Sequence, residues 1–504
     1  MPNDNAYDLL IIGGGINGAG IACDAAGRGL SVALCEQGDL AGQTSSASSK
    51  MIHGGLRYLE HGEFRLVREA LQEREVLMRN APHLVAPLRL ILPHTPDQRP
   101  AWMIHVGLLL YDHLGNRETL SSSKCFRLAN HPARKVFKPA FKSAFAYSDC
   151  RVDDSRLVIA NALTARKNGA EILTRHRLER AQSRNGQWLV SLRRAESGDR
   201  VEISARALVN TAGTAVEAVL NATTTPRKRN RIRLVKGSHI VVPRFFEGAE
   251  GFLLQNPDGR VIFVIPFEQH YSIIGTTDVP IKTPEDGWAI NPAETRYLCE
   301  AVNRYFQSQL IPDDVVWSFS GVRSLFDDGE SDPSAVTRDY VLELDAPANA
   351  PPVLSVFGGK ITTYRRLAEA AMDRLGAYFP GLGRAWTADR PLAGGDLTAP
   401  NLEALLNKLK FDYPKLPSHL LQALARRHGG WTTRVLDRAH TTEDLGPDFG
   451  GCLTGREVDY LIKEEWAKTP EDILWRRTKS GLHIDAAGRQ RLEKYMATRT
   501  AVTA

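Results

Sequence analysis

The chain opens with a short apolar run that leads directly into glycines. Residues 7–12 (YDLLII) are almost continuously apolar, which is typical of a strand buried on both faces of a parallel sheet. The glycine-rich segment 13–18 (GGGING) follows, and an alanine-rich stretch from Ile16 to Arg28 ends at a glycine, where a helix is expected to stop. Residues 31–34 (SVAL) then form a second apolar run that leads to Glu36. This order predicts a βαβ unit.

Other apolar runs show which distant segments belong together. Residues 207–210 and 353–357 are short apolar runs that also meet glycine. Because such runs suit buried parallel strands, they predict that segments from far along the chain complete the same sheet. Residues 64–80 and 155–167 carry apolar side chains at helical spacing and are expected to be helices.

In the middle of the chain the apolar runs have a different spacing. Apolar runs about eight to twelve residues apart are typical of an antiparallel sheet, and four of them occur at 238–243, 252–255, 261–266 and 271–275. Glycine and proline are dense between residues 380 and 395, which indicates a linker, and helical patterning follows to the C-terminus. We therefore expect an inserted β layer and a C-terminal helical region.

The glycines after the first predicted strand form a nucleotide-binding motif. Gly13, Gly15 and Gly18 fit the pattern G-x-G-x-x-G, and Glu36 stands 18 residues beyond Gly18, at the end of the second strand. Glycines let the backbone approach a pyrophosphate, and a carboxylate at the strand end accepts hydrogen bonds from a ribose diol. An acid at this place disfavours a 2′-phosphate, so the motif favours FAD or NAD over NADP.

Two further segments favour FAD over NAD. Residues 208–213 (LVNTAG) form a strand that runs into small residues, and residues 355–364 (SVFGGKITTY) combine a strand, a glycine pair and hydroxyl side chains at the start of a helix. The N-terminus of that helix would stabilise negative charge on a reduced flavin, a role that NAD does not require. The expected fold is therefore α/β, with a Rossmann-like FAD-binding domain, an inserted antiparallel-β substrate domain and a C-terminal helical domain.

The boundaries of these domains follow from the same patterns. The FAD-binding domain is expected to be discontinuous and to comprise residues 1–85, 150–235 and 340–385. The substrate-binding cap takes residues 86–149 and 236–339, and the helical domain takes residues 396–504.

Composition and charge narrow the function classes. The 504 residues are 43% hydrophobic and 24% charged, with a net charge of +6, which is typical of a large globular protein and too mild for a dedicated nucleic-acid binder. The six cysteines contain no Cys-x-x-Cys pair, so neither a disulfide framework nor a metal site is expected. The N-terminus lacks the basic region of a signal peptide. The longest apolar stretch, near residues 102–111, falls short of the ~20 residues that span a bilayer, so any membrane association is expected to be peripheral.

Several long motifs resemble those of one enzyme family. The strings IIGGGINGAGIACDAAGRGLSV, TSSASSKMIHGGLRYLEHGEFRLVREALQERE, KGSHIVVP, IIGTTDV, SGVRSL and VFGGKITTYRRLAE resemble the FAD-dependent aerobic glycerol-3-phosphate dehydrogenases of the bacterial, membrane-associated type. The resemblance runs from Tyr7 to the C-terminal region. It implies oxidation of sn-glycerol 3-phosphate to dihydroxyacetone phosphate, with electrons passing through FAD to membrane quinone, in a cytoplasmic protein attached peripherally to the inner face of the cell membrane. It leaves a homodimer open.

The matched motifs carry the expected cofactor site. FAD is expected to be bound without a covalent link, and the loop 44–50 (TSSASSK) resembles the flavin-contacting loop of the family. One departure lies after the small-residue strand, where the chain has Gly213-Thr214-Ala215 in place of the Gly-Pro-Trp often found in the family. The expected cofactor-binding residues are Gly13, Gly15, Asn17, Gly18, Glu36, Thr44, Ser45, Ser48, Ala212, Gly213, Gly358, Gly359, Ile361, Thr362 and Thr363.

The substrate chemistry requires cations and a base. A phosphomonoester carries about two negative charges and suits arginine, which binds it through charge-assisted hydrogen bonds. Oxidation of a secondary alcohol also requires a base for the hydroxyl proton, and histidine is the usual one. By the family motifs, His239 is the first choice for this base and His53 the second, with Arg323 beside them at the reacting centre. The expected substrate-binding residues are Arg57, Tyr58, Thr276, Arg323 and Lys360, and the neighbouring Thr277 offers a further hydroxyl.

Three alternatives remain at this point: an oxygen-reducing oxidase, an amine or amino-acid oxidase, and a flavoprotein that acts as a nucleic-acid-binding or structural module, which the matched catalytic motifs disfavour. A soluble glycerol-3-phosphate oxidase that reduces oxygen needs the same half-reaction, and an amine or amino-acid oxidase of the same superfamily would use an arginine for a carboxylate. The basic cluster at 226–236 (PRKRNRIRLVK) suits either an anionic lipid surface or a solvated loop. It lacks the interleaved aromatic residues of a nucleic-acid platform, so no nucleic-acid partner is expected.

Overall fold

The first sheet is the expected parallel one. The computed structural model describes residues 6–115, 117–223, 232–327, 339–348, 350–399 and 401–500. Five strands lie in parallel in the order β18-β10-β1-β2-β7, and β17 joins β18 antiparallel at the edge. The bounds are β1 (Ala6–Ile12), β2 (Val32–Glu36), β7 (Glu171–Thr174), β10 (Arg200–Asn210), β17 (Val341–Asp345) and β18 (Val353–Phe357). Strands distant in sequence thus meet in one sheet, as the apolar runs predict.

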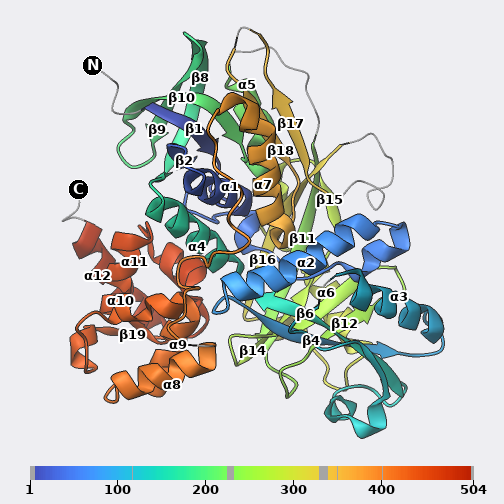
Figure 1. Cartoon of the computed structure of the whole chain (residues 1–504). Coiled ribbons are helices and arrows are strands. Elements are labelled where there is room, and N and C mark those ends of the chain that lie inside the picture. The colour runs from blue at the N-terminus through green and yellow to red at the C-terminus, as the bar shows by residue number, and fades with distance from the viewer. Residues whose placement is uncertain are drawn as a thin grey trace.

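Two different layers cover the faces of this sheet (Figure 1). One face packs against α1 (Ile16–Gly27), α4 (Asp154–Lys167) and α7 (Tyr364–Leu375). The other face packs against β8 (His176–Arg184) and β9 (Gln187–Arg194), which extend from the long strand β10, and against α5 (Val216–Asn221). Leu9 and Ile11 of β1 point to the helical side while Leu10 and Ile12 point to the β side, as strand alternation requires. Both faces are therefore apolar, which explains the continuous run at 7–12.

The second sheet is mostly antiparallel. Its order is β15-β11-β14-β13-β12-β4-β6-β3, with β16 paired to β11 and β5 paired to β6. Among the described strand pairs of this sheet, only β12 and β4 run parallel. The strands are β3 (Met51–Ile52), β4 (Val85–His94), β5 (Lys124–Arg127), β6 (Ser143–Val152), β11 (Ile232–Pro243), β12 (Gly251–Gln255), β13 (Val261–Phe267), β14 (Tyr271–Gly275), β15 (Val279–Ile281) and β16 (Trp317–Phe326). Helices α2 (Phe64–Asn80) and α3 (Ala101–Leu114) pack on one face, and α6 (Pro292–Asn303) packs on the other.

The strand bounds cross two of the domain boundaries expected from the sequence. Strand β6 runs through the boundary at residues 149 and 150, and β11 runs through the one at 235 and 236. The short strand β3 also belongs to the second sheet, although it lies within the segment expected for the first domain. A hydrogen-bonded strand cannot be divided between two sheets, so the second layer extends beyond its expected segments, forward to residue 152 at the end of β6 and back to residue 232 at the start of β11.

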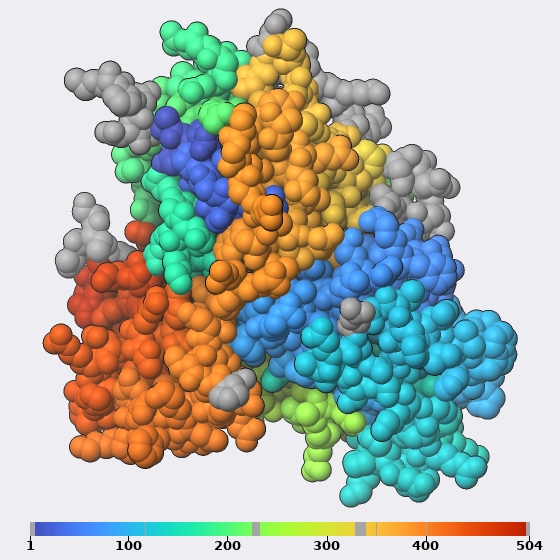
Figure 2. Space-filling model, viewed as in Figure 1, coloured from blue at the N-terminus to red at the C-terminus, as the bar shows by residue number. Residues whose placement is uncertain are grey.

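The C-terminal region is helical. It contains α8 (Leu402–Asp412), α9 (Ser418–His428), α10 (Thr432–Leu436), α11 (Gly455–Glu464) and α12 (Ala486–Thr500), with the two-stranded ribbon β19 (Asp448–Gly450) and β20 (Leu453–Thr454). It lies below the first sheet and α4 in Figure 1, and its orange and red atoms fill the lower left of the molecule in Figure 2. This arrangement confirms the predicted α/β class with a helical C-terminal domain. Throughout the described ranges, each helix is too short or too polar to cross a bilayer.

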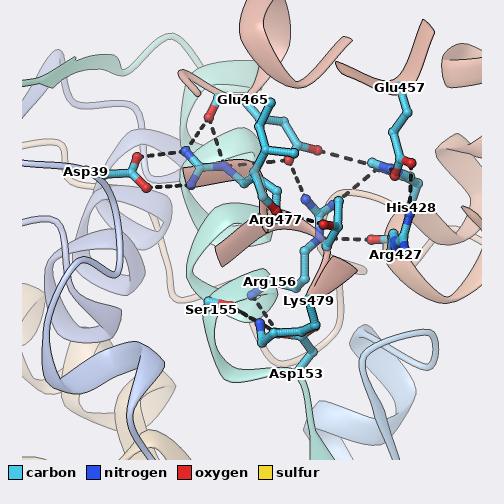
Figure 3. A network of polar contacts seen from close by, with 12 residues as sticks. Asp39, Asp153, Ser155, Arg156, Arg427, His428, Glu457, Glu465, Arg477 and Lys479 are labelled. Carbon is cyan, nitrogen blue, oxygen red and sulfur yellow. Dashed lines mark hydrogen bonds and ion pairs between the residues drawn. The ribbon is translucent and has the colours of Figure 1, made fainter. Parts of the chain in front are cut away.

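A buried network of ion pairs joins the C-terminal domain to the first sheet (Figure 3). The Arg477 guanidinium, fully buried, donates to both carboxylate oxygens of Asp39 at 2.7 and 2.8 Å. Lys479 donates to Asp153 at 3.1 Å and to Ser155 at 2.7 Å, both at the start of α4. These contacts hold the C-terminal domain against the loop that follows β2.

Candidate functional site

A cavity of about 1140 Å³ lies between the two sheets. Its wall takes residues from the glycine turn after β1, the loop after β2, the segment after β10, strands β11 and β16, and residues 358–362 after β18. Small-molecule sites commonly have volumes of roughly 300–1,000 Å³. The cavity is therefore large enough for a dinucleotide and a small substrate together.

The glycine turn after β1, which we call the glycine cradle, passes too close to the residues after β10 for a side chain to fit at Gly13. Gly13 has φ +114°, and a Cβ on it would lie 2.6 Å from the carbonyl oxygen of Thr211. Gly15 is the N-cap residue of helix α1, and it has no side chain that could bond to the free N–H groups of the first turn. The backbone N–H groups and partial positive charge of such a helix start suit a pyrophosphate.

Glu36 closes the cradle at the end of β2. Its carboxylate accepts hydrogen bonds from the amides of Gly14 at 2.7 Å and Gly38 at 2.8 Å, and burial raises its pKa. Each carboxylate oxygen has room for a further hydrogen bond, so Glu36 fits a ribose diol.

The segment after β18 supplies the opposite wall. Gly358 and Gly359 have φ +70° and +96°, and a Cβ on Gly359 would lie 2.8 Å from the side-chain nitrogen of Asn17. That nitrogen donates to the carbonyl of Gly358 at 3.1 Å. The turn Ile361–Thr363 then leads into α7. The two glycines thus let this helix start come close to the glycine turn, as a flavin between them would require.

The serine-rich loop after β2 is anchored at several points. Thr44 donates to the carbonyl of Val322 at 2.7 Å, and the Ser45 hydroxyl accepts from the amide of Ile16 at 2.9 Å. Ser48 and Lys50 both donate to Asp154 at 2.7 Å. The loop therefore has a fixed path along the cavity, between the glycine turn and the second sheet.

His239 lies on β11 and is almost fully buried. Its Nε2 lies 2.9 Å from the Ser49 hydroxyl, and its ring stacks on Phe319 with centroids 4.8 Å apart. Its Nδ1 has no hydrogen-bond partner within the described part of the chain. Burial, followed by the nearby cations Lys50 and Arg323, lowers the pKa of His239 to about 3. The imidazole is therefore neutral near pH 7 and has a lone pair available.

The predicted cations gather on the same wall. Arg323 on β16 forms an ion pair with Asp278, and a Cβ on Gly237 would lie 3.0 Å from its guanidinium and 2.7 Å from the Thr276 hydroxyl. The ammonium of Lys360 lies 3.8 Å from the centre of the Tyr58 ring. Such a group of cations favours an anionic substrate.

The turn at residues 53–58 completes this region. His53 is half-buried and lines the cavity. Burial lowers its pKa, and the carboxylate of Asp149 opposes that effect. Arg57 also lines the cavity and has no acidic partner among the residues that the structure describes, so its guanidinium is available to a phosphate.

The structure brings most of the predicted residues to the cavity and places three elsewhere. Gly18 lies beneath the wall, where a Cβ would come within 1.9 Å of the Gly13 carbonyl, so it serves helix packing. Thr363 is buried at the start of α7, outside the wall. Thr277 does not line the cavity either, because its hydroxyl accepts from the Ser238 amide and donates to Glu294. All other residues expected for the site lie on the wall.

The basic cluster expected at 226–236 is only partly described. Residues 226–231 lie outside the described residues. Lys236 points inward, is buried, and forms an ion pair with Glu294 at 2.7 Å. The described end of this cluster is thus structural.

Sequence reasoning missed some residues of the wall. Ser49 stands inside a recognised loop, but its side-chain contact with His239 joins residues 190 positions apart. Asp149 follows an ordinary strand pattern, and Asp278 stands inside the recognised string IIGTTDV, but no local signal marks either carboxylate as facing the cavity.

Comparisons with known proteins match nearly the whole chain. Residues 8–365 match the family model described as FAD dependent oxidoreductase, and residues 385–500 match the one described as C-terminal domain of alpha-glycerophosphate oxidase. The glycerol-3-phosphate dehydrogenase of Pseudomonas aeruginosa is 51% identical over 98% of this chain and 96% of its own length. The aerobic glycerol-3-phosphate dehydrogenase of Escherichia coli is 48% identical over 98% of both chains, and the D-erythritol 1-phosphate dehydrogenase of Brucella abortus is 50% identical over 97% of both. The solved structure of a glycerol-3-phosphate dehydrogenase from Bacillus halodurans, complexed with FAD, has a TM-score of 0.78 at 26% identity and covers 99% of this chain and 91% of its own.

Proposed function

This chain belongs to the FAD-dependent glycerol-3-phosphate dehydrogenase family, and from that premise we propose that it oxidises sn-glycerol 3-phosphate to dihydroxyacetone phosphate and passes the electrons to membrane quinone. The observation that carries the proposal is the convergence of cations and neutral histidines on one cavity wall beside the glycine cradle. In this proposal Gly13, Gly15 and Glu36 on the cavity wall would hold the dinucleotide, and residues 358–362 would lie against the flavin. When bound, FAD accepts the hydride that the alcohol carbon loses.

The chain's own residues bind the substrate and take its proton. Arg57 and Arg323 bind the phosphate, and each charge-assisted hydrogen bond contributes about 1.5–3 kcal/mol. Lys360 adds a third positive charge at the same wall. This geometry presents the substrate hydroxyl to a histidine.

His239 is the proposed base, with His53 as the second choice. A base whose pKa is about 3 accepts a proton reluctantly, since the best catalytic pKa lies near the working pH. A bound phosphate dianion offsets the positive potential of Arg323 and so raises the pKa of His239. Substrate binding thereby prepares the base.

A second substrate class is favoured by one relative. The D-erythritol 1-phosphate dehydrogenase is as similar to this chain as the glycerol-3-phosphate dehydrogenases are. Both substrates are polyol monophosphates, and the cations suit either. The experiment that tests the proposed function must therefore include both phosphate esters.

The test is anaerobic reduction of the flavin. The purified, FAD-loaded protein is mixed with sn-glycerol 3-phosphate, D-erythritol 1-phosphate, glycerol or an amino acid, and the absorbance of the oxidised flavin is followed. Rapid bleaching by sn-glycerol 3-phosphate alone supports the proposal. Faster bleaching by D-erythritol 1-phosphate would make that ester the assigned substrate. Bleaching by an amino acid would overturn the proposal.

Helix α3 supplies the surface that we propose for membrane docking. Trp102, Met103, Val106, Leu109 and Leu110 are 42–66% exposed and recur at helical spacing. No acidic residue occurs in the helix before Asp112. An exposed apolar helix face with a tryptophan and no acid suits the interfacial region of an anionic bilayer. Docking there would bring the cavity close to membrane quinone.

A further inference from the structure

Tyr111 connects helix α3 to the turn that carries His53. Its hydroxyl accepts a hydrogen bond from the Gly54 amide at 2.8 Å and donates one to Asp149 at 2.7 Å. The residue is only 2% exposed. Burial, followed by the Asp149 carboxylate, raises the pKa of Tyr111 far above its usual value, so the phenol keeps the proton that it donates.

Asp149 and Arg74 hold the tyrosine hydroxyl in place. Asp149, on β6, accepts from Arg74 at 2.9 Å and also lies 3.3 Å from the Gly54 amide. Arg74, on α2, donates in addition to the Ser148 carbonyl at 2.6 Å. All of these side chains are buried. The cluster therefore joins α2, α3 and β6 through buried hydrogen bonds.

The turn is built around this tyrosine. A Cβ on Gly54 would lie 2.6 Å from the Tyr111 hydroxyl and 2.5 Å from Leu71. Gly55 has φ +75°, and a Cβ on it would lie 2.2 Å from the Tyr58 ring. Glycine at both positions lets the turn pass between Tyr111 and Tyr58. The path of the turn sets where His53 and Arg57 face the cavity.

We propose that Tyr111 is a positioning residue for the oxidation reaction: through the Gly54 amide its hydroxyl fixes the direction in which His53 and Arg57 meet the phosphorylated substrate. The inference rests on the proposed function for the identity of that substrate. Phenylalanine has the shape of tyrosine but can neither accept from Gly54 nor donate to Asp149. In Tyr111→Phe the Gly54 amide keeps only the long contact to Asp149, so the turn moves toward the carboxylate.

The experiment measures substrate binding and flavin reduction separately. Stopped-flow reduction at increasing sn-glycerol 3-phosphate gives the limiting rate and the apparent Kd for the wild type and for Tyr111→Phe. We expect the apparent Kd to rise about 10-fold or more and the limiting rate to fall less, because Arg57 holds the phosphate in both the ground state and the transition state. FAD content and spectrum are expected to stay unchanged.

Tyr305→Phe is the matched control. Tyr305 is 3% exposed, and its hydroxyl accepts from Gln98 at 3.0 Å and donates to the carbonyl of Gln255, but it does not line the cavity. We expect a similar loss of thermal stability with an unchanged apparent Kd. If the two variants show the same kinetics at the same loss of stability, Tyr111 is only structural and the proposal is overturned.

Binding of inorganic phosphate separates this proposal from the proposed function. Calorimetric titration of the FAD-loaded protein with phosphate needs no turnover. If sn-glycerol 3-phosphate does not bleach the wild-type flavin but Tyr111→Phe still weakens phosphate binding, the substrate assignment fails and the positioning role stands. Equal phosphate affinity in wild type and Tyr111→Phe contradicts the positioning role.

Discussion

The protonation of His239 decides what it can do and how the protein responds to acid. Burial and nearby cations lower the pKa of His239 to about 3. Between pH 6.5 and about 3 this histidine therefore stays unprotonated in the folded protein, whereas in the unfolded chain it takes up a proton below about pH 6.5. The stability that this neutral histidine confers is thus complete above pH 6.5 and is lost as pH falls. At about 1.4 kcal/mol per pH unit, the loss reaches roughly 2–3 kcal/mol by pH 4.5.

His239→Gln tests both the stability and the chemistry. We expect the free energy of unfolding of the wild type, relative to the variant, to fall by that amount between pH 6.5 and 4.5 in denaturant titrations. We also expect flavin reduction by substrate to slow by about 10²- to 10⁴-fold, as for loss of a positioned base, with FAD still bound. Unchanged reduction kinetics would remove His239 as the base and leave His53→Gln as the next variant to measure.

At the scale of single elements, α3 shows what local patterns can and cannot predict. The βαβ unit at the N-terminus follows from neighbouring residues, because glycines, strand and helix lie within one short segment. Helix α3 is apolar on its inner face, at Ile104, Leu108 and Tyr111, and also on its outer face. A helix without a polar side has no periodic signal to separate core from surface. Only the packing of the inner face shows that the other apolar face is exposed.

The outer face of α3 can be altered without touching the site. In Trp102→Ser/Leu109→Ser/Leu110→Ser, three exposed side chains become polar, so the free energy of unfolding is expected to change little. We expect co-sedimentation with vesicles of anionic phospholipid to decrease, and electron transfer to vesicle-bound quinone to decrease with it. Anaerobic flavin reduction by dissolved substrate stays at the wild-type rate, because Tyr111 and the cavity are unchanged.

Phe411→Ser is the control for this surface. Phe411 is 84% exposed on α8, in the C-terminal domain, on the other side of the molecule from α3 (Figure 1). Its loss is expected to leave vesicle binding unchanged. If Phe411→Ser weakens binding and the α3 variant does not, the docking face lies on the C-terminal domain instead.

At the scale of the whole molecule, contacts between distant segments are the features of the structure that could not be predicted from the sequence. The matched motifs led to Gly13, His239 and Arg323 because each lies in a characteristic string, and the spacing after the glycine motif led to Glu36. The pairing of Asp39 with Arg477 spans 438 residues, and neither residue lies in a motif. Buried ion pairs of this kind form only when two domains meet. For this reason the link between the C-terminal domain and the nucleotide site emerges only from the structure.

This link predicts a role for the C-terminal domain in holding FAD. Asp39 lies three residues after Glu36, and the neighbouring Ala41 amide donates to the Gly14 carbonyl at 3.0 Å. The Arg477 guanidinium therefore steadies the loop that lies against the glycine cradle (Figure 3). Arg477→Lys keeps the charge but loses the two-point contact, and disruption of a buried pair costs up to about 3–5 kcal/mol. We expect a lower Tm, faster release of FAD, measured by the rise of flavin fluorescence on dilution, and partial recovery of Tm with excess FAD, since a ligand that binds only the folded state stabilises it.

Arg499→Lys is the matched change at an exposed pair. Arg499 forms an ion pair with Asp459 at 3.2 Å, with both side chains about half exposed, and such pairs contribute at most about 1 kcal/mol. FAD release is expected to stay at the wild-type rate in this variant. A lower Tm in Arg477→Lys with unchanged FAD release would mean that the pair only joins the domains. Among the described ranges, the C-terminal domain contributes no residue to the cavity wall. Faster FAD release in Arg477→Lys alone would mean that this domain nevertheless sets how tightly the cofactor is held.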